Sequence, residues 1–133
     1  MKKNVLQSFV DEWLASWTGN RPDVLLDFYT HDVFYLDPVN PKGLSGKEQL
    51  FTYFKRLLQK NPNWKWTEEE IFPTEKGFTI KWRAEIPIAQ ENLIIYGLDI
   101  VEMTGDKISR NEVYFDRYDW LMKMTKQNTA GQP

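Results

Sequence analysis

The stretch VFYLDPVNPKGLSG, residues 33–46, divides helix-like sequence from strand-like sequence in this chain. It starts as an apolar run of β-branched and aromatic residues, which is typical of a strand, and that run ends at Asp37. Pro38 follows, and a proline disfavours the α region for the residue before it. Asp37 is therefore expected to be extended, to end the strand in an Asp-Pro turn, and to project its carboxylate in a defined direction.

Three helices are predicted around this stretch, two before it and one after it. Residues 4–18 carry apolar side chains at three- and four-residue steps, and residues 20–29 have the proline and aspartate that suit a first helical turn. The third helix is expected to begin at a capping box formed by Ser45 and Glu48 and to stop at Asn61. Each helix has one apolar face to bury.

After residue 64 the apolar pattern changes to a period of two, which predicts strands. Four strands are expected, joined by short polar turns: residues 64–72, 78–86, 93–103 and 108–118. Short turns between long strands indicate an antiparallel meander. Gly97, inside the third of these strands, is expected to mark a bend or bulge.

Helices that precede a long antiparallel sheet predict an α+β fold. A sheet of this length must twist and curl, so we expect a conical α+β barrel with three N-terminal helices packed on the concave face of a strongly curved, mainly antiparallel sheet. Such a shape leaves a cavity suited to a small molecule. The length of 133 residues predicts a single domain over residues 1–126, with a short helical end at residues 119–126 and a frayed polar tail at residues 127–133.

The composition excludes several classes of function. A net charge of −2 and a pI near 5.5 argue against nucleic-acid binding, which requires a clustered basic face. No apolar run approaches membrane-spanning length, and the lack of cysteine removes disulfides, thiolate metal sites and cysteine nucleophiles. The sequence contains no phosphate-binding loop, metal motif or nucleophile elbow. We therefore expect a cytoplasmic domain without a cofactor or metal, and without a nucleic-acid or membrane partner.

Several short motifs occur in a characteristic order along the chain. They are LDFYTHDV at residues 26–33, Asp37-Pro38, LSG at residues 44–46, GLD at residues 97–99 and GDKI at residues 105–108. Together they resemble the nuclear-transport-factor-2-like superfamily in its SnoaL-like branch, over about residues 4–120. The resemblance implies the conical fold and a homodimer through the outer face of the sheet. It implies no single reaction, because this superfamily includes isomerases, cyclases, dehydratases, epoxide hydrolases and non-catalytic binders.

Two aspartates carry a distant local likeness to ketosteroid isomerase. That family has its catalytic base in an Asp-Pro-Val segment, matched here by Asp37-Pro38-Val39, and a protonated aspartic acid at a strand position that Asp99 matches. The resemblance implies that Asp37 removes a proton next to a carbonyl while neutral Asp99 donates a hydrogen bond to the oxygen. Trp13 occupies the position of that family's oxyanion tyrosine, and an indole N–H is far less acidic than a phenol. Isomerisation of a steroid is therefore not expected.

Both aspartates also have an alternative interpretation without chemistry. Asp37 ends a strand in an Asp-Pro turn, which is common in any fold. Asp99 lies in phase with the apolar residues of its strand, and an unpaired buried carboxylate is costly. Its alternative role is a structural ion pair, and the possible partners are Lys81, Arg83 and Arg110.

Four aromatic residues complete the candidate site: Trp13, Tyr53, Trp82 and Tyr114 are expected to line the cavity and bind a substrate. The first hypothesis is a domain that binds a small hydrophobic molecule, with cofactor-free acid–base chemistry of the isomerase, cyclase or dehydratase type on a carbonyl substrate. The second hypothesis is a non-catalytic ligand-binding or dimerisation module in which both carboxylates are structural.

Overall fold

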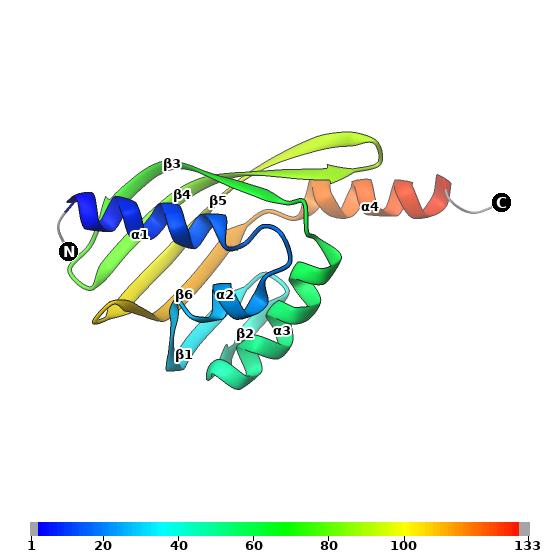
Figure 1. Cartoon of the computed structure of the whole chain (residues 1–133). Helices are drawn as coiled ribbons and strands as arrows, with labels where there is room; N and C mark the ends of the chain where they lie inside the picture. Colours follow the sequence, from blue (N-terminus) through cyan, green and yellow to red (C-terminus); the bar gives the residue numbers. More distant parts are fainter. Residues whose placement is uncertain (1–2, 131–133) are drawn as a thin grey trace.

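The computed structural model describes residues 3–130, with side chains described through residue 125 (Figure 1). The elements in chain order are α1 (Lys3–Ala15), α2 (Pro22–Leu26), β1 (Tyr29–Asp37), β2 (Asn40–Ser45), α3 (Lys47–Lys60), β3 (Lys65–Pro73), β4 (Gly77–Ile88), β5 (Glu91–Thr104), β6 (Lys107–Phe115) and α4 (Tyr118–Ala130). The predicted α+β class is confirmed.

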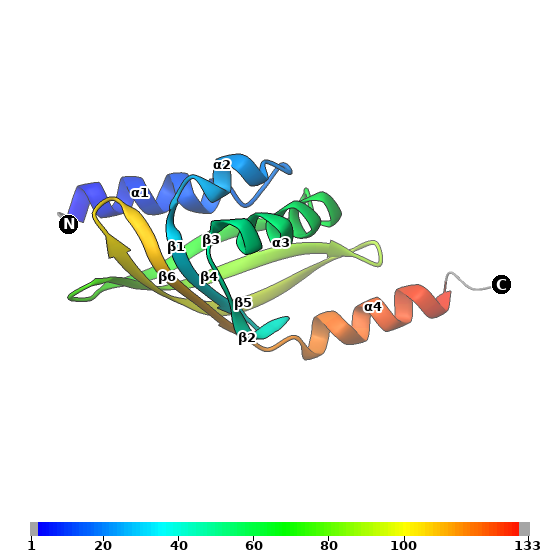
Figure 2. The ribbon, with the colours of Figure 1, turned by 90° about the horizontal axis from the view of Figure 1, so that it is seen from below.

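The strands form one six-stranded sheet in the order β2-β1-β6-β5-β4-β3. β1 and β6 are parallel, and all other neighbouring strands are antiparallel. The sheet is strongly curved and unclosed, and α1, α2 and α3 lie over its concave face (Figure 2). Both the predicted meander of the last four strands and the placement of the helices are confirmed. The final strand, β6, lies inside the sheet between β1 and β5.

The core lies between the helices and the concave face. Along β4, Phe78, Ile80, Trp82, Ala84 and Ile86 are buried at alternate positions, as the period of two predicts. From the helical side, α1 adds a buried stripe: Leu6, Val10, Trp13 and Leu14. Each large side chain buried in this way stabilises the fold by about 1.5–3 kcal/mol relative to an exposed one.

Around the Asp-Pro turn the chain differs from the prediction in two ways. Residues 40–45 form β2, an edge strand paired only with β1, although their composition is that of a loop. Pro41 is tolerated there because an edge strand leaves one row of N–H groups unpaired. The second predicted helix is also shorter than expected, because it ends at Leu26 and the sheet begins at Tyr29.

The predicted capping box of the third helix is wrong. Ser45 lies in β2, and Gly46 is the residue that precedes the helix, with a φ of 89° and no side-chain capping bond. The side chain of Gln49 reaches back instead, and its Oε1 accepts a hydrogen bond from the Ser45 N–H at 3.0 Å. Glycine adopts a positive φ at little cost, so the chain turns into the helix at Gly46 without a serine cap.

Of the predicted bend or bulge at Gly97, the bulge is wrong. Gly97 pairs in regular register with Trp82 on one side and Phe115 on the other, and the register shift of this strand pair lies at Glu102 and Met103 instead. The glycine is required by a close approach: a Cβ there would lie 2.3 Å from the Trp82 ring. Its missing side chain makes room for an indole.

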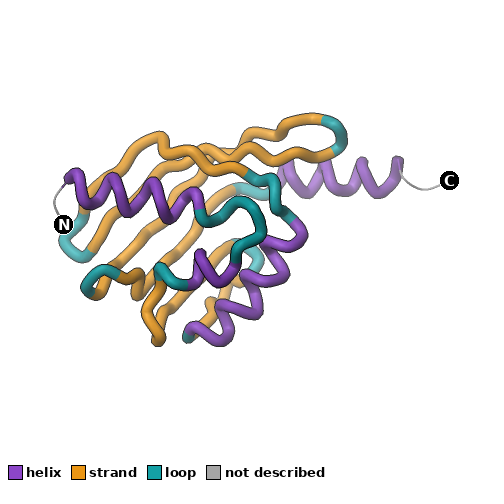
Figure 3. The backbone as a smooth tube through the Cα atoms, in the orientation of Figure 1, coloured by secondary structure: helices purple, strands orange, loops and turns teal. Residues whose placement is uncertain are grey.

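The predicted C-terminal helix is longer than expected. α4 begins at Tyr118, continues to Ala130 and projects away from the rest of the domain (Figures 2 and 3). It is attached by the Trp120 ring, whose centroid lies 5.4 Å from that of Trp64, and by an ion pair of Lys123 with Glu91. The expected frayed tail falls partly on this helix, and residues 131–133 lie outside the described residues. No helix within residues 3–130 is long and apolar enough to cross a membrane.

Candidate functional site

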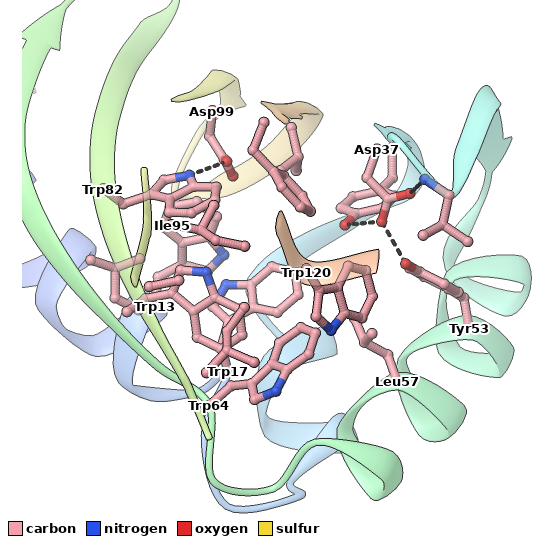
Figure 4. Close-up of a pocket in the computed structure, with 18 residues that line it drawn as sticks. Trp13, Trp17, Asp37, Tyr53, Leu57, Trp64, Trp82, Ile95, Asp99 and Trp120 are labelled. Atoms are coloured by element: carbon pink, nitrogen blue, oxygen red, sulfur yellow. Dashed lines mark hydrogen bonds between the residues drawn. The ribbon is translucent and has the colours of Figure 1, made fainter. Parts of the chain in front are cut away.

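A cavity of about 70 Å³ lies between the concave face of the sheet and the helices (Figure 4). This is well below the roughly 300–1,000 Å³ of pockets that enclose drug-sized ligands. All six tryptophans of the chain line the cavity, and the other aromatic residues in its wall are Tyr35, Tyr53 and Phe115. The remaining wall is mostly aliphatic, with two carboxyl groups, those of Asp37 and Asp99.

Five of the tryptophans form a continuous row of ring contacts from α1 to α4. The row runs Trp13, Trp17, Trp66, Trp64, Trp120, with successive centroids 6.3, 5.8, 5.6 and 5.4 Å apart. Neighbouring rings are tilted by 46–83° rather than stacked. They therefore form angled walls that present indole surface to the cavity from several directions (Figure 4).

Asp37 ends β1 and accepts five hydrogen bonds. The hydroxyls of Tyr35 and Tyr53 donate to Oδ2 at 2.8 and 2.6 Å. The backbone N–H groups of Val39 and Asn40, together with the Asn40 side-chain amide, donate to Oδ1 at 3.0, 2.8 and 3.0 Å. A carboxylate offers about four lone-pair sites, so all of them are engaged. Asp37 both organises the turn that follows it and orders two tyrosines of the cavity wall.

Asp99 lies on the buried face of β5 and ends a directed chain of hydrogen bonds. Trp13 Nε1 donates to Tyr29 Oη at 3.2 Å, that hydroxyl donates to Asn111 Oδ1 at 2.8 Å, and Asn111 Nδ2 donates to Asp99 Oδ2 at 2.9 Å. Trp82 Nε1 donates to the other carboxylate oxygen at 2.8 Å. Because an indole N–H is a donor only, Trp13 sets the direction of every hydrogen bond in this series. Asp99 therefore accepts hydrogen bonds on both of its oxygens.

Burial works against this arrangement of donors. The pKa of Asp99 is raised from 3.8 to about 6: desolvation is the main cause, the hydrogen bonds from Asn111 and Trp82 oppose it, and repulsion from Asp37 adds to it. Burial likewise raises the pKa of Tyr29 and Tyr35 well above the usual range, and with repulsion from Asp37 it raises that of Tyr53. These tyrosines therefore stay protonated and act as donors.

The stability of the protein is expected to fall as the pH rises through the window from about 4 to about 6. The folded protein holds the Asp99 proton up to a higher pH than the unfolded chain does, so in this window raising the pH favours unfolding. At pH values above the folded-state pKa, the loss in the free energy of unfolding reaches about 3 kcal/mol. Urea unfolding of the wild type and Asp99→Asn at several pH values isolates it, because the other carboxylates titrate in both proteins. A stability difference between the two that does not change with pH contradicts the raised pKa.

The structure places five of the six predicted site residues in the cavity wall: Trp13, Tyr53, Trp82, Asp37 and Asp99. The prediction for Tyr114 is wrong, because its side chain is 47% exposed on the opposite face of the sheet. The signal was present in the alternation of β6, where Val113 and Phe115 line the cavity on either side of it.

The alternative role of Asp99 in a structural ion pair is also wrong. Within the described part of the chain its polar partners are an indole and an amide, and no lysine or arginine pairs with it. Arg110, one of the suggested partners, pairs instead with Glu102 at 2.9 Å on the other face of the sheet. Sequence reasoning missed Trp120, because nothing in the local pattern says that the last helix returns an indole to the cavity.

The sequence matches the family model described as SnoaL-like domain over residues 10–111. Among curated proteins, none matches the chain. Solved structures share the fold. A hypothetical protein from Catenulispora acidiphila with a ketosteroid isomerase-like fold, in complex with trimethylamine, is 22% identical with a TM-score of 0.71, and the match covers 94% of this chain and 93% of that one.

Two further structures extend this comparison. A putative SnoaL-like polyketide cyclase from Jannaschia sp. is 11% identical with a TM-score of 0.76, covering 98% of this chain and 94% of that one. A SnoaL-like protein of unknown function from Burkholderia thailandensis is 20% identical with a TM-score of 0.71, covering 87% and 98%. At these identities the likeness concerns the fold.

Proposed function

Because the chain belongs to the SnoaL-like domain family, we propose that it binds a small molecule in the aromatic cavity between its sheet and its helices. One observation carries this proposal: all six tryptophans line one cavity that also contains two buried carboxyl groups. A concave, mostly apolar site with a few polar groups is the usual form of a small-molecule site. The trimethylamine complex of the Catenulispora protein supports the idea that this fold accommodates a small ligand.

The size of the cavity restricts the ligand. A volume of about 70 Å³ suits a compact molecule, because pockets that enclose larger, drug-sized ligands measure roughly 300–1,000 Å³. A polycyclic substrate would require the wall to open, which supports a compact ligand as the natural occupant.

Filling the cavity is expected to weaken binding strongly without unfolding the protein. Ala84 is 1% exposed in the cavity wall, and Ala84→Leu adds a side chain that occupies much of the space. Titrating compounds of roughly ten non-hydrogen atoms or fewer against intrinsic tryptophan fluorescence should identify ligands, since every tryptophan lines the cavity. Ala84→Leu should bind them at least about tenfold more weakly, and Tyr114→Ala, on the opposite face, should bind them as the wild type does. Unchanged affinity in Ala84→Leu contradicts the proposal.

A second candidate function is proton transfer on a small carbonyl compound. It is favoured by the pKa of Asp99, about 6, which supplies a neutral carboxylic acid at the cavity wall below that pH. It is disfavoured by Asp37, because a base whose lone pairs already accept five hydrogen bonds must lose one of them to take a proton. The test is deuterium exchange at the α-carbons of cyclohexanone, followed by NMR. Acceleration that is lost in both Asp37→Asn and Asp99→Asn supports catalysis, and a buffer-like rate rejects it.

We also propose a homodimer through the outer face of the sheet. Tyr96, Leu98 and Tyr114 are exposed side by side there, and Leu98 is paired directly with Tyr114 across β5 and β6. A patch of large apolar side chains on a sheet face is typical of an interaction surface. A strictly monomeric mass in light scattering at high protein concentration rejects this proposal. A cytoplasmic location stays a prediction from the sequence.

A further inference from the structure

The formal charges around the cavity have one sign. Among the described residues, its wall contains the carboxyl groups of Asp37 and Asp99 and no lysine, arginine or histidine. An anionic ligand would be repelled by such a wall, and a neutral one would leave the buried charge without a counter-charge. The wall therefore favours a cationic ligand.

Asp99 has the stronger need for a counter-charge. Its partners are neutral donors: the Trp82 indole can only donate, and the Asn111 amide donates through Nδ2 because its oxygen accepts from Tyr29, so the network favours the ionised form. Burying an ionised carboxylate without a cation is unfavourable, and in the free protein this is reflected in its raised pKa. A bound cation would remove that disadvantage.

The aromatic wall determines the kind of cation. Indole is the best aromatic partner for a cation over its face, and tilted rings surround the space from several sides. A primary ammonium ion brings three N–H donors that each need an acceptor, whereas the lone pairs of Asp37 are engaged and Asp99, which already accepts two hydrogen bonds, offers about two more. An ammonium ion carrying methyl groups spreads its charge over apolar surface and needs few acceptors or none.

We propose that the ligand is a compact quaternary or tertiary alkylammonium ion, held against the tryptophan faces with Asp99 as its counter-charge. The inference rests on the proposed function, that the cavity binds a small molecule, and goes further by assigning the chemical class of that molecule. It also assigns roles: Trp120 and Trp64 contribute aromatic wall, and Asp99 contributes charge.

Choline and its neutral carbon isostere, 3,3-dimethylbutan-1-ol, provide the direct test because they have the same shape and differ in charge. At about pH 8, where Asp99 is ionised, choline should bind at least about tenfold more tightly than the isostere in a fluorescence or calorimetric titration. Butylamine should bind more weakly than choline, because Asp99 already accepts two hydrogen bonds and offers acceptors for about two of the three N–H donors of butylamine.

Two variants separate the contributions of charge and aromatic surface. Asp99→Asn keeps the shape of the side chain and should weaken choline binding at least about fivefold while leaving the isostere unaffected. Trp120 lies on α4, outside the main core, so Trp120→Leu is expected to fold. A circular dichroism spectrum like that of the wild type checks this. The variant should lower choline affinity by about fivefold and isostere affinity by less.

The affinity for choline should also depend on pH. Below about pH 6 the proton taken up by Asp99 removes its charge, so choline affinity should fall by up to about tenfold per pH unit in the wild type and stay level in Asp99→Asn. The groups that influence Asp99 are its donors Trp82 and Asn111 and the neighbouring Tyr29, Tyr35 and Asp37. The tyrosines keep their protons throughout this range.

The outcomes distinguish this inference from the proposed function. If the isostere binds as tightly as choline, or more tightly, the inference is overturned and the small-molecule site stands. If neither probe binds but another compound binds in a way that Ala84→Leu weakens strongly, the inference is overturned in the same way. If no compound binds at all, the proposed function fails with it.

Discussion

Gly97→Ala is expected to lower the free energy of unfolding by about 3–5 kcal/mol, although it adds a single methyl group. The new Cβ would lie 2.3–2.9 Å from three atoms of the Trp82 ring, so the indole must move. Gly97 itself is held by paired strands on both sides and cannot retreat. Moving the indole breaks its hydrogen bond to Asp99 and its edge contact with Phe115, whose centroid is 5.6 Å away.

Urea unfolding of Gly97→Ala in two backgrounds tests the cause as well as the size of this loss. In Trp82→Phe the clashing part of the indole is absent, so the same glycine substitution should cost about 1 kcal/mol or less. An equal cost in both backgrounds would show that the backbone, rather than the indole, requires the glycine.

Asp37→Ala is expected to cost about 3–5 kcal/mol, because it removes the acceptor for five donors at once. The hydroxyls of buried Tyr35 and partly buried Tyr53 would lose their acceptor, and the turn N–H groups of Val39 and Asn40 would lose theirs. The expected loss exceeds that of a surface aspartate by a wide margin. Chemical denaturation monitored by circular dichroism measures it.

Asp37→Asn provides the graded comparison. Its remaining oxygen can still accept from the turn, and a tyrosine hydroxyl can rotate to accept from the new amide, so a cost of about 1–2 kcal/mol is expected. Asp32→Ala, at an exposed position in the same strand, should stay within about 0.5 kcal/mol of the wild type. If Asp37→Ala is no more harmful than Asp32→Ala, the carboxylate does not organise this turn.

Regular alternation made much of the sheet predictable. Along β4 and β5 a period of two assigns each residue to one face, and it placed Asp99 correctly on the buried side. Helix α1 was equally predictable, since its apolar stripe repeats over several turns. Such patterns are visible because burial on one face leaves a mark at every second or every third to fourth residue.

The parts that could not be predicted depend on contacts between distant segments. Residues 40–45 have the composition of a loop and become β2 only because β1 offers them a free edge. The close contact of Gly97 with Trp82 joins positions on different strands, and a single glycine looks the same whether it bends a strand or admits a ring. For Trp120 the decisive factor is the direction in which α4 leaves the sheet, which no local pattern specifies.

The position of β6 inside the sheet has a consequence for how the protein is made. On the ribosome, β1 and β2 emerge early, but β1 has no parallel partner until β6 has been synthesised. Pairing between such distant segments closes a long loop and is slow compared with local hairpin formation. The N-terminal third must therefore wait with an unpaired strand edge while β3, β4 and β5 form their hairpins. Trp120, the last residue of the cavity wall along the chain, follows β6, so the wall cannot be complete until both have emerged.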